Sequence, residues 1–492
     1  MLNKTEGQNI LSRRDFIKAA AAAGTGVIFS QNPVFARLSN PARKTRYAQV
    51  GTGHRAKMYQ DAIYKTYTSS CQMVGFCDTN LGRLKLAQSK AQKVTGVDIP
   101  IFEAKGFDRM IKETKPDIVI VTTVDGFHHE YIVRALELGK DVITEKPLTV
   151  DEEKCQQIID AQRKTGRKVT VAFNYRYSPV RTQVKELLMD GVIGDVLSVD
   201  FHWMLNTLHG ADYFRRWHSQ KKFSGGLMVH KATHHFDLIN WWLSAVPVTV
   251  FGKGKREFYT PEMIKRFGLE GFHERCHTCP EKEKCAFELN IEKDNYLKEL
   301  YLDNESYDGY FRDRCIFRPD TDIEDTMNVI AKYDNNATMS YSLNAFNSWE
   351  GYYVIFNGTK GRLEHKMEEK VFLSKDNLNT QALKGDGTYI RIYPIRGAAY
   401  NVEARSGEGG HAGGDNVLLE DLFSPEKKSD RCLRASDYRA GAYACLTGIA
   451  ANKSFKTNSE INISGLVKNL DKPDLAVMPS KSEKISMPEK NV

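Results

Sequence analysis

Residues 46–56 read Arg-Tyr-Ala-Gln-Val-Gly-Thr-Gly-His-Arg-Ala, a short apolar run that passes directly into the pattern G-x-G-x-x-A. The run predicts a β-strand, and the residues from Ala56 to about Tyr64 predict a helix. At such a turn Gly51 permits a tight bend, Gly53 lets the backbone approach a diphosphate, and a small residue at position 56 lets helix and strand pack closely. The phosphates then lie at the helix N-terminus. This stretch predicts a dinucleotide-binding fold.

A second predicted strand, residues 73–78, ends in an acidic residue. Asp78 lies 22 residues after Ala56. A carboxylate at this point accepts hydrogen bonds from the ribose hydroxyls of NAD and repels the 2′-phosphate of NADP, so we predict NAD, with NADP as the alternative cofactor. The other interpretation of Asp78 is a helix N-cap or a turn residue. The predicted cofactor contacts in this region are Gly51, Thr52, Gly53, His54, Arg55 and Asp78.

Strands and helices continue to alternate as far as residue 173. The pattern predicts helices over 107–113, 129–138 and 152–165, and strands over 117–122, 141–144 and 168–173. Such alternation predicts a doubly wound parallel sheet, whose ligands bind at the carboxyl ends of the strands. The residues at two of these ends complete the predicted cofactor contacts: Thr122, Thr123 and His128 at one, and Glu145 and Lys146 at the next.

Several short motifs follow one another in a fixed order along residues 46–240. They are Gly51-Thr52-Gly53, Asp78, Thr122-Thr123-Val124-Asp125 with His128, Glu145-Lys146-Pro147, Asn174-Tyr175-Arg176-Tyr177, and Gly225-Gly226 leading to His234. In this order they resemble the Gfo/Idh/MocA family, which includes glucose–fructose oxidoreductase and inositol dehydrogenase. The resemblance implies an α/β protein with an NAD-binding Rossmann domain over 44–172. It also implies a substrate-binding α/β domain with an open, mostly antiparallel sheet over 173–470.

The resemblance further implies the catalytic residues. Lys146 would lie beside the nicotinamide and contact the substrate hydroxyl, and His234 matches the catalytic histidine of the family. His230 stands where the family pattern, Gly-Gly…Asp-x-Gly-x-His, has an aspartate. A neutral histidine there lets burial and nearby charge lower the pKa of Lys146, which makes the lysine a better general base. Whether Lys146 or His234 takes the hydroxyl proton stays open.

The histidine segment has other interpretations. In a helix, His230 and His234 share one face and His235 lies on the neighbouring one. Two histidines at this spacing also suit a divalent metal, and buried structural histidines are the third interpretation. We favour catalysis or substrate contact. Polar and aromatic side chains typical of sugar sites give the candidate substrate contacts, for which a solvated charged loop is the alternative: Asn174, Arg176, Arg215, Trp217 and His235.

Residues 253–317 are rich in charged and aromatic residues and are predicted to be an insertion in the second domain. The segment contains Cys276, Cys279, Cys285 and Cys315. A C-x₂-C pair with two further thiols favours a structural zinc site. An oxidising compartment would favour disulfides instead, and free thiols are the third interpretation.

The two ends of the chain read differently from its body. Residues 12–18, Ser-Arg-Arg-Asp-Phe-Ile-Lys, precede an apolar run rich in Ala and Gly and a small-residue site at 34–36. This order predicts a signal peptide over 1–36, and the paired arginines resemble the twin-arginine export signal. By that resemblance the protein is exported already folded, to the periplasm or an equivalent compartment, with a cofactor inside. Residues 471–492 are predicted to be a disordered tail.

The composition of the 492 residues narrows the functional class. Their formal net charge of +8 is mild for this length, which argues against nucleic acid as a partner. The sequence contains no run of 18 apolar residues, so we expect no membrane span in the mature protein. The family resemblance implies a small carbohydrate as the substrate and a homo-oligomer.

We therefore predict an NAD(P)-dependent oxidoreductase that takes hydride from a hydroxyl of a sugar, cyclitol or glycoside. Because NAD is made in the cytoplasm, an exported enzyme is expected to hold its cofactor tightly and to recycle it within each cycle. The alternative is an NAD-requiring glycoside hydrolase or lyase that oxidises the sugar only transiently. A third hypothesis is a sugar-binding protein without catalysis on the same fold.

Overall fold

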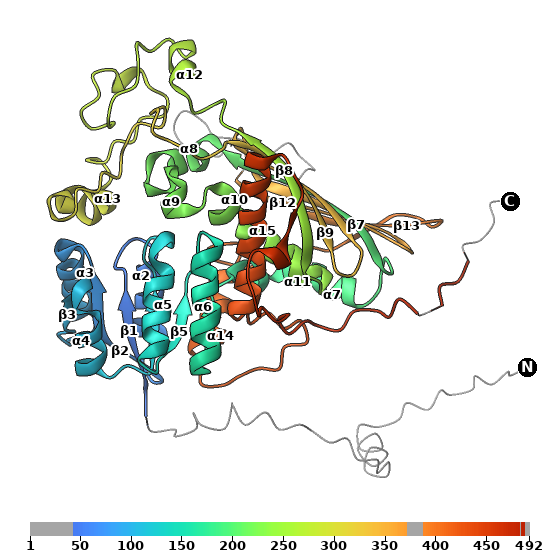
Figure 1. Cartoon of the computed structure of the whole chain (residues 1–492), viewed down its shortest axis with the longest axis horizontal. Coiled ribbons are helices and arrows are strands. Elements are labelled where there is room, and N and C mark those ends of the chain that lie inside the picture. The colour runs from blue at the N-terminus through green and yellow to red at the C-terminus, as the bar shows by residue number, and fades with distance from the viewer. Residues whose placement is uncertain (1–42, 371–386, 483, 488–492) are drawn as a thin grey trace, which may run out of the picture. The chain divides into compact units, whose positions relative to one another are not determined.

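The strand before the glycine-rich turn belongs to a six-stranded parallel sheet (Figure 1). The structure, a computed structural model, describes residues 43–370, 387–482 and 484–487. The strand order is β3-β2-β1-β4-β5-β6, so the order reverses between β1 and β4. The strands are β1 (Thr45–Val50), β2 (Cys71–Asp78), β3 (Ile101–Glu103), β4 (Ile118–Val121), β5 (Asp141–Thr144) and β6 (Val169–Val171). The predicted doubly wound parallel sheet is thus confirmed.

Both faces of this sheet are buried, as parallel sheets require. On β4, Val119 and Val121 pack into one apolar cluster, whereas Ile120 between them packs into a second cluster. Alternating side chains of a strand point to opposite faces, so each cluster fills one face. The covering helices are α2 (Ala56–Asp61, extended by a π-turn over Ala62–Thr66), α3 (Leu81–Thr95), α4 (Phe107–Thr114), α5 (His128–Glu137) and α6 (Glu152–Thr165).

Local sequence explains where the longer helices begin and end. The side chain of Asn80 accepts a hydrogen bond from the Arg83 backbone N–H at the start of α3. Asp151 does the same for Lys154 at the start of α6. Gly96 and Gly166 end these helices with φ of 73° and 64°, a conformation that glycine adopts without strain.

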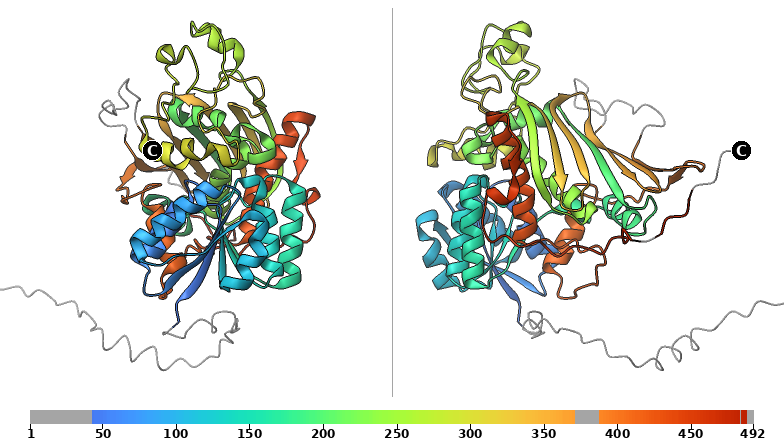
Figure 2. Two further views of the ribbon diagram at one scale, coloured as in Figure 1. Left: turned by 90° about the vertical axis from the view of Figure 1, so that its left-hand side faces the viewer. Right: turned by 45° about the vertical axis from the view of Figure 1, so that its right-hand side comes forward.

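The second sheet has nine strands and is mostly antiparallel, as expected. Its order is β14-β13-β12-β11-β7-β10-β9-β8-β15. Among the described strands of this second sheet, only β7 and β10 pair in parallel. The right-hand view of Figure 2 shows its open face. The strands are β7 (Val196–Asn206), β8 (Pro247–Lys255), β9 (Thr326–Tyr333), β10 (Thr338–Asn347), β11 (Glu350–Gly358), β12 (Gly361–Lys370), β13 (Tyr389–Pro394), β14 (Tyr400–Val402) and β15 (Ile461–Asn462).

Aromatic side chains join this sheet to the helix α11. Phe236 on α11 lies 5.0 Å from Tyr341 on β10 between ring centroids, and Trp242 lies 5.5 Å from Phe356 on β11. The remaining helices are α7 (Pro179–Met189), α8 (Thr207–Arg215), α9 (Lys221–Ser224), α10 (Leu227–His230), α11 (Ala232–Leu243), α12 (Pro261–Arg266), α13 (Asn295–Leu300), α14 (Gly414–Phe423) and α15 (Tyr438–Thr457).

Helix α15 connects the two sheets, since it contacts β6 and α6 as well as β8 and α11. Its Gly448 lies against the backbone of α10: a Cβ there would stand 2.1 Å from the carbonyl oxygen of Met228. A glycine at this position therefore permits the close approach that brings the histidine segment toward the first sheet.

Three predictions about segments have different outcomes. The predicted signal peptide, residues 1–36, lies outside the described residues. The insertion leaves the second sheet between β8 and β9 and carries α12 and α13 (Figure 1). The start of the predicted tail is not free of contacts: the Lys185 ammonium donates a hydrogen bond to Met478 Sδ at 3.3 Å, and Ala476 is buried.

Among the helices of the described residues, none combines the length and apolar character needed to cross a membrane.

Candidate active site

The turn after β1 has the geometry of a phosphate-binding loop. Gly51 adopts φ of +88°, and a Cβ there would stand 2.5 Å from the carbonyl oxygen of Thr122 on the neighbouring strand. The Thr122 hydroxyl donates to the Gly51 carbonyl at 2.6 Å, which ties the turn to the end of β4. At Gly53 a Cβ would meet only the Tyr301 hydroxyl, 3.8 Å away. The backbone at Gly53 is therefore open to a diphosphate, and the turn fits a dinucleotide.

Asp78 at the end of β2 is held in place by the same turn. Its Oδ2 accepts hydrogen bonds from the Thr52 backbone N–H at 2.6 Å and from the Thr52 hydroxyl at 2.9 Å. Its Oδ1 accepts one from the backbone N–H of Asn80 at 2.8 Å. The carboxylate thus lies beside the glycine-rich turn, where an acidic residue fits the ribose hydroxyls of NAD.

Lys146 follows β5 and reaches the histidine segment of the second domain. Its Nζ lies 3.2 Å from the carbonyl oxygen of His230 and 3.4 Å from His230 Nε2. Burial lowers the pKa of Lys146 to about 8, although the Asp125 and Glu145 carboxyl groups oppose the change. An amine with this pKa has a sizeable neutral fraction near neutral pH, so it can accept a proton.

His230 is itself held by a carboxyl group. Its Nδ1 lies 2.5 Å from Oδ2 of Asp125, which follows β4. When the ring proton is on Nδ1, this N–H donates a hydrogen bond to Asp125. The Nε2 lone pair then faces the Lys146 ammonium. Burial, together with the charge of Lys146, lowers the pKa of His230 well below its usual value, so the ring is neutral. The structure therefore places an aspartate near Lys146 after all, with a histidine between them.

Buried polar atoms without a hydrogen-bond partner among the described residues include Asn174 Oδ1, His218 Nδ1 and His234 Nδ1. Both of these histidines lie within electrostatic reach of Lys146. The His234 ring stacks on Tyr175 with 4.2 Å between centroids, and the charge of Lys146 adds to the burial that lowers its pKa. His218 contacts the His230 ring at 4.1 Å and stacks on Trp217 at 3.5 Å. Unpaired polar atoms of this kind suit a ligand with several hydroxyl groups.

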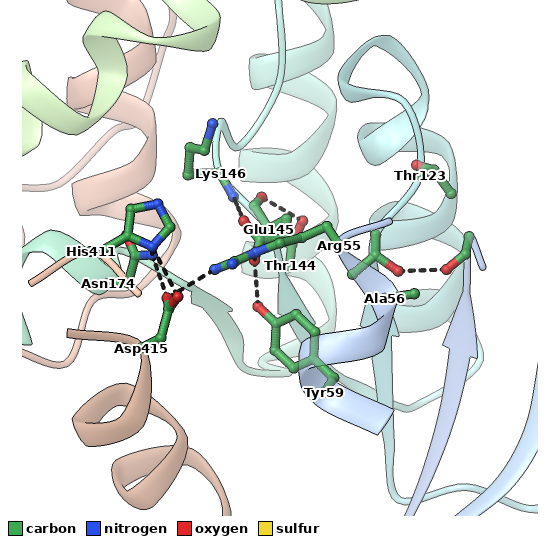
Figure 3. Close-up of polar contacts among 12 residues, drawn as sticks. Arg55, Ala56, Tyr59, Thr123, Thr144, Glu145, Lys146, Asn174, His411 and Asp415 are labelled. Atoms are coloured by element: carbon green, nitrogen blue, oxygen red, sulfur yellow. Dashed lines mark hydrogen bonds and ion pairs between the residues drawn. The ribbon is translucent and has the colours of Figure 1, made fainter. Parts of the chain in front are cut away.

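A network of charges joins the glycine-rich turn to a loop near the C-terminus (Figure 3). Arg55 Nε donates to Glu145 at 2.6 Å, and its Nη2 lies 3.3 Å from Asp415. Asp415 also accepts from the Asn174 side-chain amide at 2.6 Å and lies 2.9 Å from His411 Nδ1. Burial raises the pKa of the Asp415 carboxyl, but its partners His411 and Arg55 outweigh this effect and lower the pKa below its usual range. The predicted cofactor contact Arg55 thus bridges two carboxylates.

Four of the predicted cofactor contacts have hydrogen-bond partners within the protein. Both ring nitrogens of the fully buried His128 face backbone carbonyls, those of Pro147 at 2.8 Å and Thr123 at 3.2 Å. His128 therefore supports the Glu145-Lys146-Pro147 turn from behind. His54 bonds through Nδ1 to the Tyr296 hydroxyl at 2.9 Å, and Thr123 donates to the Val124 carbonyl at 3.3 Å. Glu145 accepts from the Tyr59 hydroxyl at 2.8 Å as well as from Arg55.

Three predicted substrate contacts are occupied elsewhere. Arg176 forms a buried two-pronged ion pair with Asp237, at 2.7 and 2.6 Å. Arg215 donates to Cys276 Sγ at 3.2 Å and to the Phe287 carbonyl at 2.6 Å, so it anchors the insertion. His235 is fully buried. It stacks on Trp203 at 4.1 Å and bonds to the Tyr341 hydroxyl at 2.7 Å. These three side chains therefore have protein partners in the structure, Asn174 bonds to Asp415, and Trp217 stacks on His218, while the sugar contacts stay predictions.

The metal interpretations are not supported. The histidine segment is two helices rather than one, because α10 ends at His230 and α11 begins at Ala232. No group of three or more His, Cys, Asp or Glu side chains in the described residues is arranged to hold a metal ion. This applies to the proposed zinc ligands Cys276, Cys279, Cys285 and Cys315, whose thiols are free in the structure, so the structure supports neither a zinc site nor a disulfide in the insertion.

Several residues of the site were not predicted. Asp125 ends the motif at residues 122–125, but its partner His230 is 105 positions away in the sequence. His411 lies in a glycine-rich loop in which His411 and Ala412 both have φ of 55°, and Asp415 lies in the first turn of α14, which follows this loop. Such consecutive positive φ values are unusual for residues other than glycine and are found at functional sites. The replacement of the family aspartate by His230 was a signal that another carboxyl group would lie nearby.

Both domains match one family of known proteins. Residues 45–173 match the family described as an oxidoreductase family with an NAD-binding Rossmann fold. Residues 185–463 match the C-terminal alpha/beta domain of the same oxidoreductase family. The two matches together span most of the chain, and their junction coincides with the passage from β6 to α7.

Individual relatives are also named as oxidoreductases or dehydrogenases. YteT of Bacillus subtilis (strain 168), named as an oxidoreductase, is 37% identical over 430 residues, which span 85% of this chain and 97% of YteT. The inositol 2-dehydrogenase/D-chiro-inositol 3-dehydrogenase of Lactiplantibacillus plantarum is 26% identical over 201 residues, 41% of this chain and 53% of that protein. Among solved structures, an Agrobacterium radiobacter oxidoreductase in complex with NAD⁺, L-tartaric acid and magnesium has a TM-score of 0.56. It is 14% identical, and the match covers 86% of this chain and all of that one.

Proposed function

This chain belongs to the Gfo/Idh/MocA family of NAD(P)-dependent oxidoreductases, and we propose that it oxidises a hydroxyl group of a sugar, cyclitol or glycoside with NAD as cofactor. The observation that carries this proposal is the position of Lys146. Its amine, with a pKa of about 8, follows β5 and contacts His230, and the unpaired ring nitrogens of His218 and His234 lie within its electrostatic reach. A base there can meet a polyhydroxyl substrate beside the cofactor.

The site residues have separate roles in the proposed oxidation. Gly51, Thr52 and Gly53 would hold the diphosphate, and Asp78 the adenosine ribose. NAD, when bound, supplies the acceptor for the hydride that leaves the carbon. The neutral Lys146 amine takes the proton from the hydroxyl oxygen, so that the C–O bond becomes a carbonyl. His230, held by Asp125, orients the amine through its carbonyl oxygen and Nε2.

The pH dependence of the reaction follows from the lowered pKa of Lys146. We expect kcat/KM for oxidation to rise about tenfold per pH unit below the pKa of about 8 and to level off above it, because only the neutral amine accepts the proton. The reverse reduction, which needs the ammonium form, should be level below this pKa and fall above it. Initial rates of the dinucleotide-loaded enzyme between about pH 6 and 10 test this. An oxidation rate that is flat across the range would contradict the role of Lys146.

His411 and Asp415 favour a second candidate function. Asp415 holds Nδ1 of His411, and the His411 side chain is 35% exposed, so its Nε2 is available as a further proton donor or acceptor. A glycoside oxidised at one carbon has an acidified neighbouring C–H, and its leaving group could then depart by elimination. The enzyme would be an NAD-requiring glycoside hydrolase or lyase without net redox change. A sugar-binding protein without turnover remains the third hypothesis.

One set of assays separates these functions. The purified protein is denatured and the released dinucleotide identified by mass, then free sugars, inositols and aryl glycosides are supplied separately. A net change in nicotinamide absorbance with a sugar or inositol supports the dehydrogenase. Release of the aglycone without such a change supports the hydrolase or lyase. Binding of a sugar without either change supports the third hypothesis, and absence of any dinucleotide after reconstitution would exclude both enzymes.

We also propose that residues 1–36 direct export by the twin-arginine route and that the cofactor travels inside the folded protein. The proposal rests on the adjacent Arg13 and Arg14 and the apolar run that follows. The double variant Arg13→Lys/Arg14→Lys is expected to remain in the cytoplasm, which cell fractionation measures. Export of the double variant at the normal level would contradict the route. An exported enzyme would regenerate its nicotinamide within each cycle. The expected homo-oligomer stays a prediction.

A further inference from the structure

Part of the insertion lies over the dinucleotide half of the first domain. We call residues 295–312 the cover segment; it comprises α13, a 3₁₀ turn over Leu302–Tyr307 and the residues that follow. Figure 1 shows α13 above α3, at the end of the parallel sheet where the glycine-rich turn lies. In open α/β sheets this end binds the ligand. The cover segment therefore lies where the adenosine diphosphate half of NAD is expected.

Two tyrosines of the cover segment contact the glycine-rich turn itself. The Tyr301 hydroxyl accepts a hydrogen bond from the backbone N–H of His54 at 3.3 Å. This N–H belongs to the G-x-G-x-x-A turn, whose backbone donors face the diphosphate in such folds. The Tyr296 hydroxyl bonds to His54 Nδ1 at 2.9 Å and fixes the ring beside the turn. A tyrosine hydroxyl can also donate a hydrogen bond, which a phosphate oxygen would accept.

Three arginines lie near the same turn. Burial lowers the pKa of His54, and the charges of Arg216, Arg312 and Arg55 add to this effect, so all three guanidinium groups lie within electrostatic reach of the turn. Arg312 belongs to the cover segment and lies 6.0 Å from the Tyr301 ring. Each guanidinium is paired with a carboxylate: Arg312 and Arg216 with Asp212 at 2.7 and 3.0 Å, and Arg55 with Glu145 and Asp415. These pairs fix the positions of the guanidinium groups around the turn.

The cover segment is anchored on both sides. On the first domain, the Asn80 side-chain amide donates to the Asn304 carbonyl at 2.9 Å, and Arg83 pairs with Asp308 at 2.6 Å. Gly82 permits this contact, because a Cβ there would stand 1.9 Å from Asn304 Oδ1. Within the insertion, Arg275 pairs with Glu305 at 2.6 Å. The segment is therefore held against α3 rather than projecting into solvent.

We propose that the cover segment forms part of the dinucleotide site, with the Tyr301 hydroxyl contacting the diphosphate, and that it slows release of the cofactor. This inference rests on the cofactor of the proposed function but not on its substrate. A bound dinucleotide would lie between the glycine-rich turn and the cover segment, so it could leave only after the contacts to Asn304 and Asp308 open. An insertion of this kind accounts for a cofactor that is retained between turnovers.

The first test measures release of NADH from the full-length protein. The protein is loaded with NADH and mixed with excess NAD⁺, and the decay of nicotinamide fluorescence gives the release rate. Tyr301→Phe is expected to release NADH about tenfold faster, since a hydrogen bond to a charged group contributes a factor of this order. Tyr307→Phe is the matched control: it removes one hydroxyl from a tyrosine of the same segment that is 48% exposed, and its rate should equal that of the unmodified protein.

A second measurement separates contact with the diphosphate from a general effect on the fold. Calorimetric binding of ADP should weaken about tenfold in Tyr301→Phe, whereas binding of adenosine, which lacks the diphosphate, should not change. Unchanged NADH release, or equal losses for ADP and adenosine, would overturn the proposal. If Tyr301→Phe fails to fold, Asp308→Asn takes its place: loss of the pair with Arg83 should speed NADH release about two- to fivefold. NADH binding by the unmodified protein tests the cofactor assignment separately.

Discussion

Replacing Lys146 by methionine is expected to lower kcat about 10²–10⁴-fold, which is the usual contribution of a general base. The side chain lies at the end of β5, and its Nζ is held by His230 at 3.2 and 3.4 Å. Methionine keeps the length of the side chain but has no group that can take the hydroxyl proton. Single-turnover rates with the preferred sugar or inositol, with dinucleotide binding measured in parallel, test this expectation.

Two further variants sharpen this prediction. Lys146→Arg keeps the positive charge, yet a guanidinium does not lose its proton in proteins, so this variant should be as slow as Lys146→Met. Exposed Lys222, on the short helix α9, provides the control: Lys222→Met should retain full activity. If Lys146→Arg kept normal activity, Lys146 would act through its charge alone. Normal activity of Lys146→Met would remove the lysine from the mechanism.

Replacing Arg176 by methionine is expected to destabilise the protein by about 3–5 kcal/mol, the usual cost of leaving one partner of a buried ion pair without the other. Asp237 is fully buried, and both of its carboxylate oxygens bond to the Arg176 guanidinium. Burial raises the pKa of Asp237 even with Arg176 in place, so the carboxyl group would be still less stable as an anion without it. Urea unfolding followed by circular dichroism measures the loss.

Matched variants distinguish this structural role from the sugar contact that the sequence predicted. The double variant Arg176→Met/Asp237→Leu should recover most of the stability, because no buried charge is left unpaired. Arg431 pairs with Asp190 on the surface, and Arg431→Met should leave the unfolding midpoint unchanged. If Arg176→Met kept its stability but lost substrate affinity, Arg176 would be a substrate contact.

Local patterns were sufficient for most elements of the first domain, although α3 and β3 were not predicted. The expected strand over 141–144 and helix over 152–165 match β5 and α6 at both ends, since Asp151 and Gly166 cap the helix. The glycine-rich turn, Asp78 and Lys146 were placed because the carboxyl ends of parallel strands meet at one edge of a sheet. Patterns of this kind depend on neighbours in the chain, which a sequence displays directly.

The roles of the polar side chains in the second domain depended on distant partners. Arg176 and Asp237 are 61 positions apart, and nothing near either residue indicates their pairing. His235 adjoins His234 in the sequence, but successive positions on a helix face different directions. One ring therefore stacks on Tyr175 at the site, and the other on Trp203 in the core.

The sequence by itself determined the dinucleotide-binding fold and the family, and it left open whether Lys146 or His234 acts as the base. The tertiary structure decided which residues surround Lys146. It placed Asp125 behind His230, assigned Arg176 and Arg215 to structural contacts, and laid the cover segment over the glycine-rich turn. The physical reason is that strands, turns and caps arise from interactions within a few residues. A buried charge or an unpaired polar atom is defined only by groups that folding brings together from distant parts of the chain.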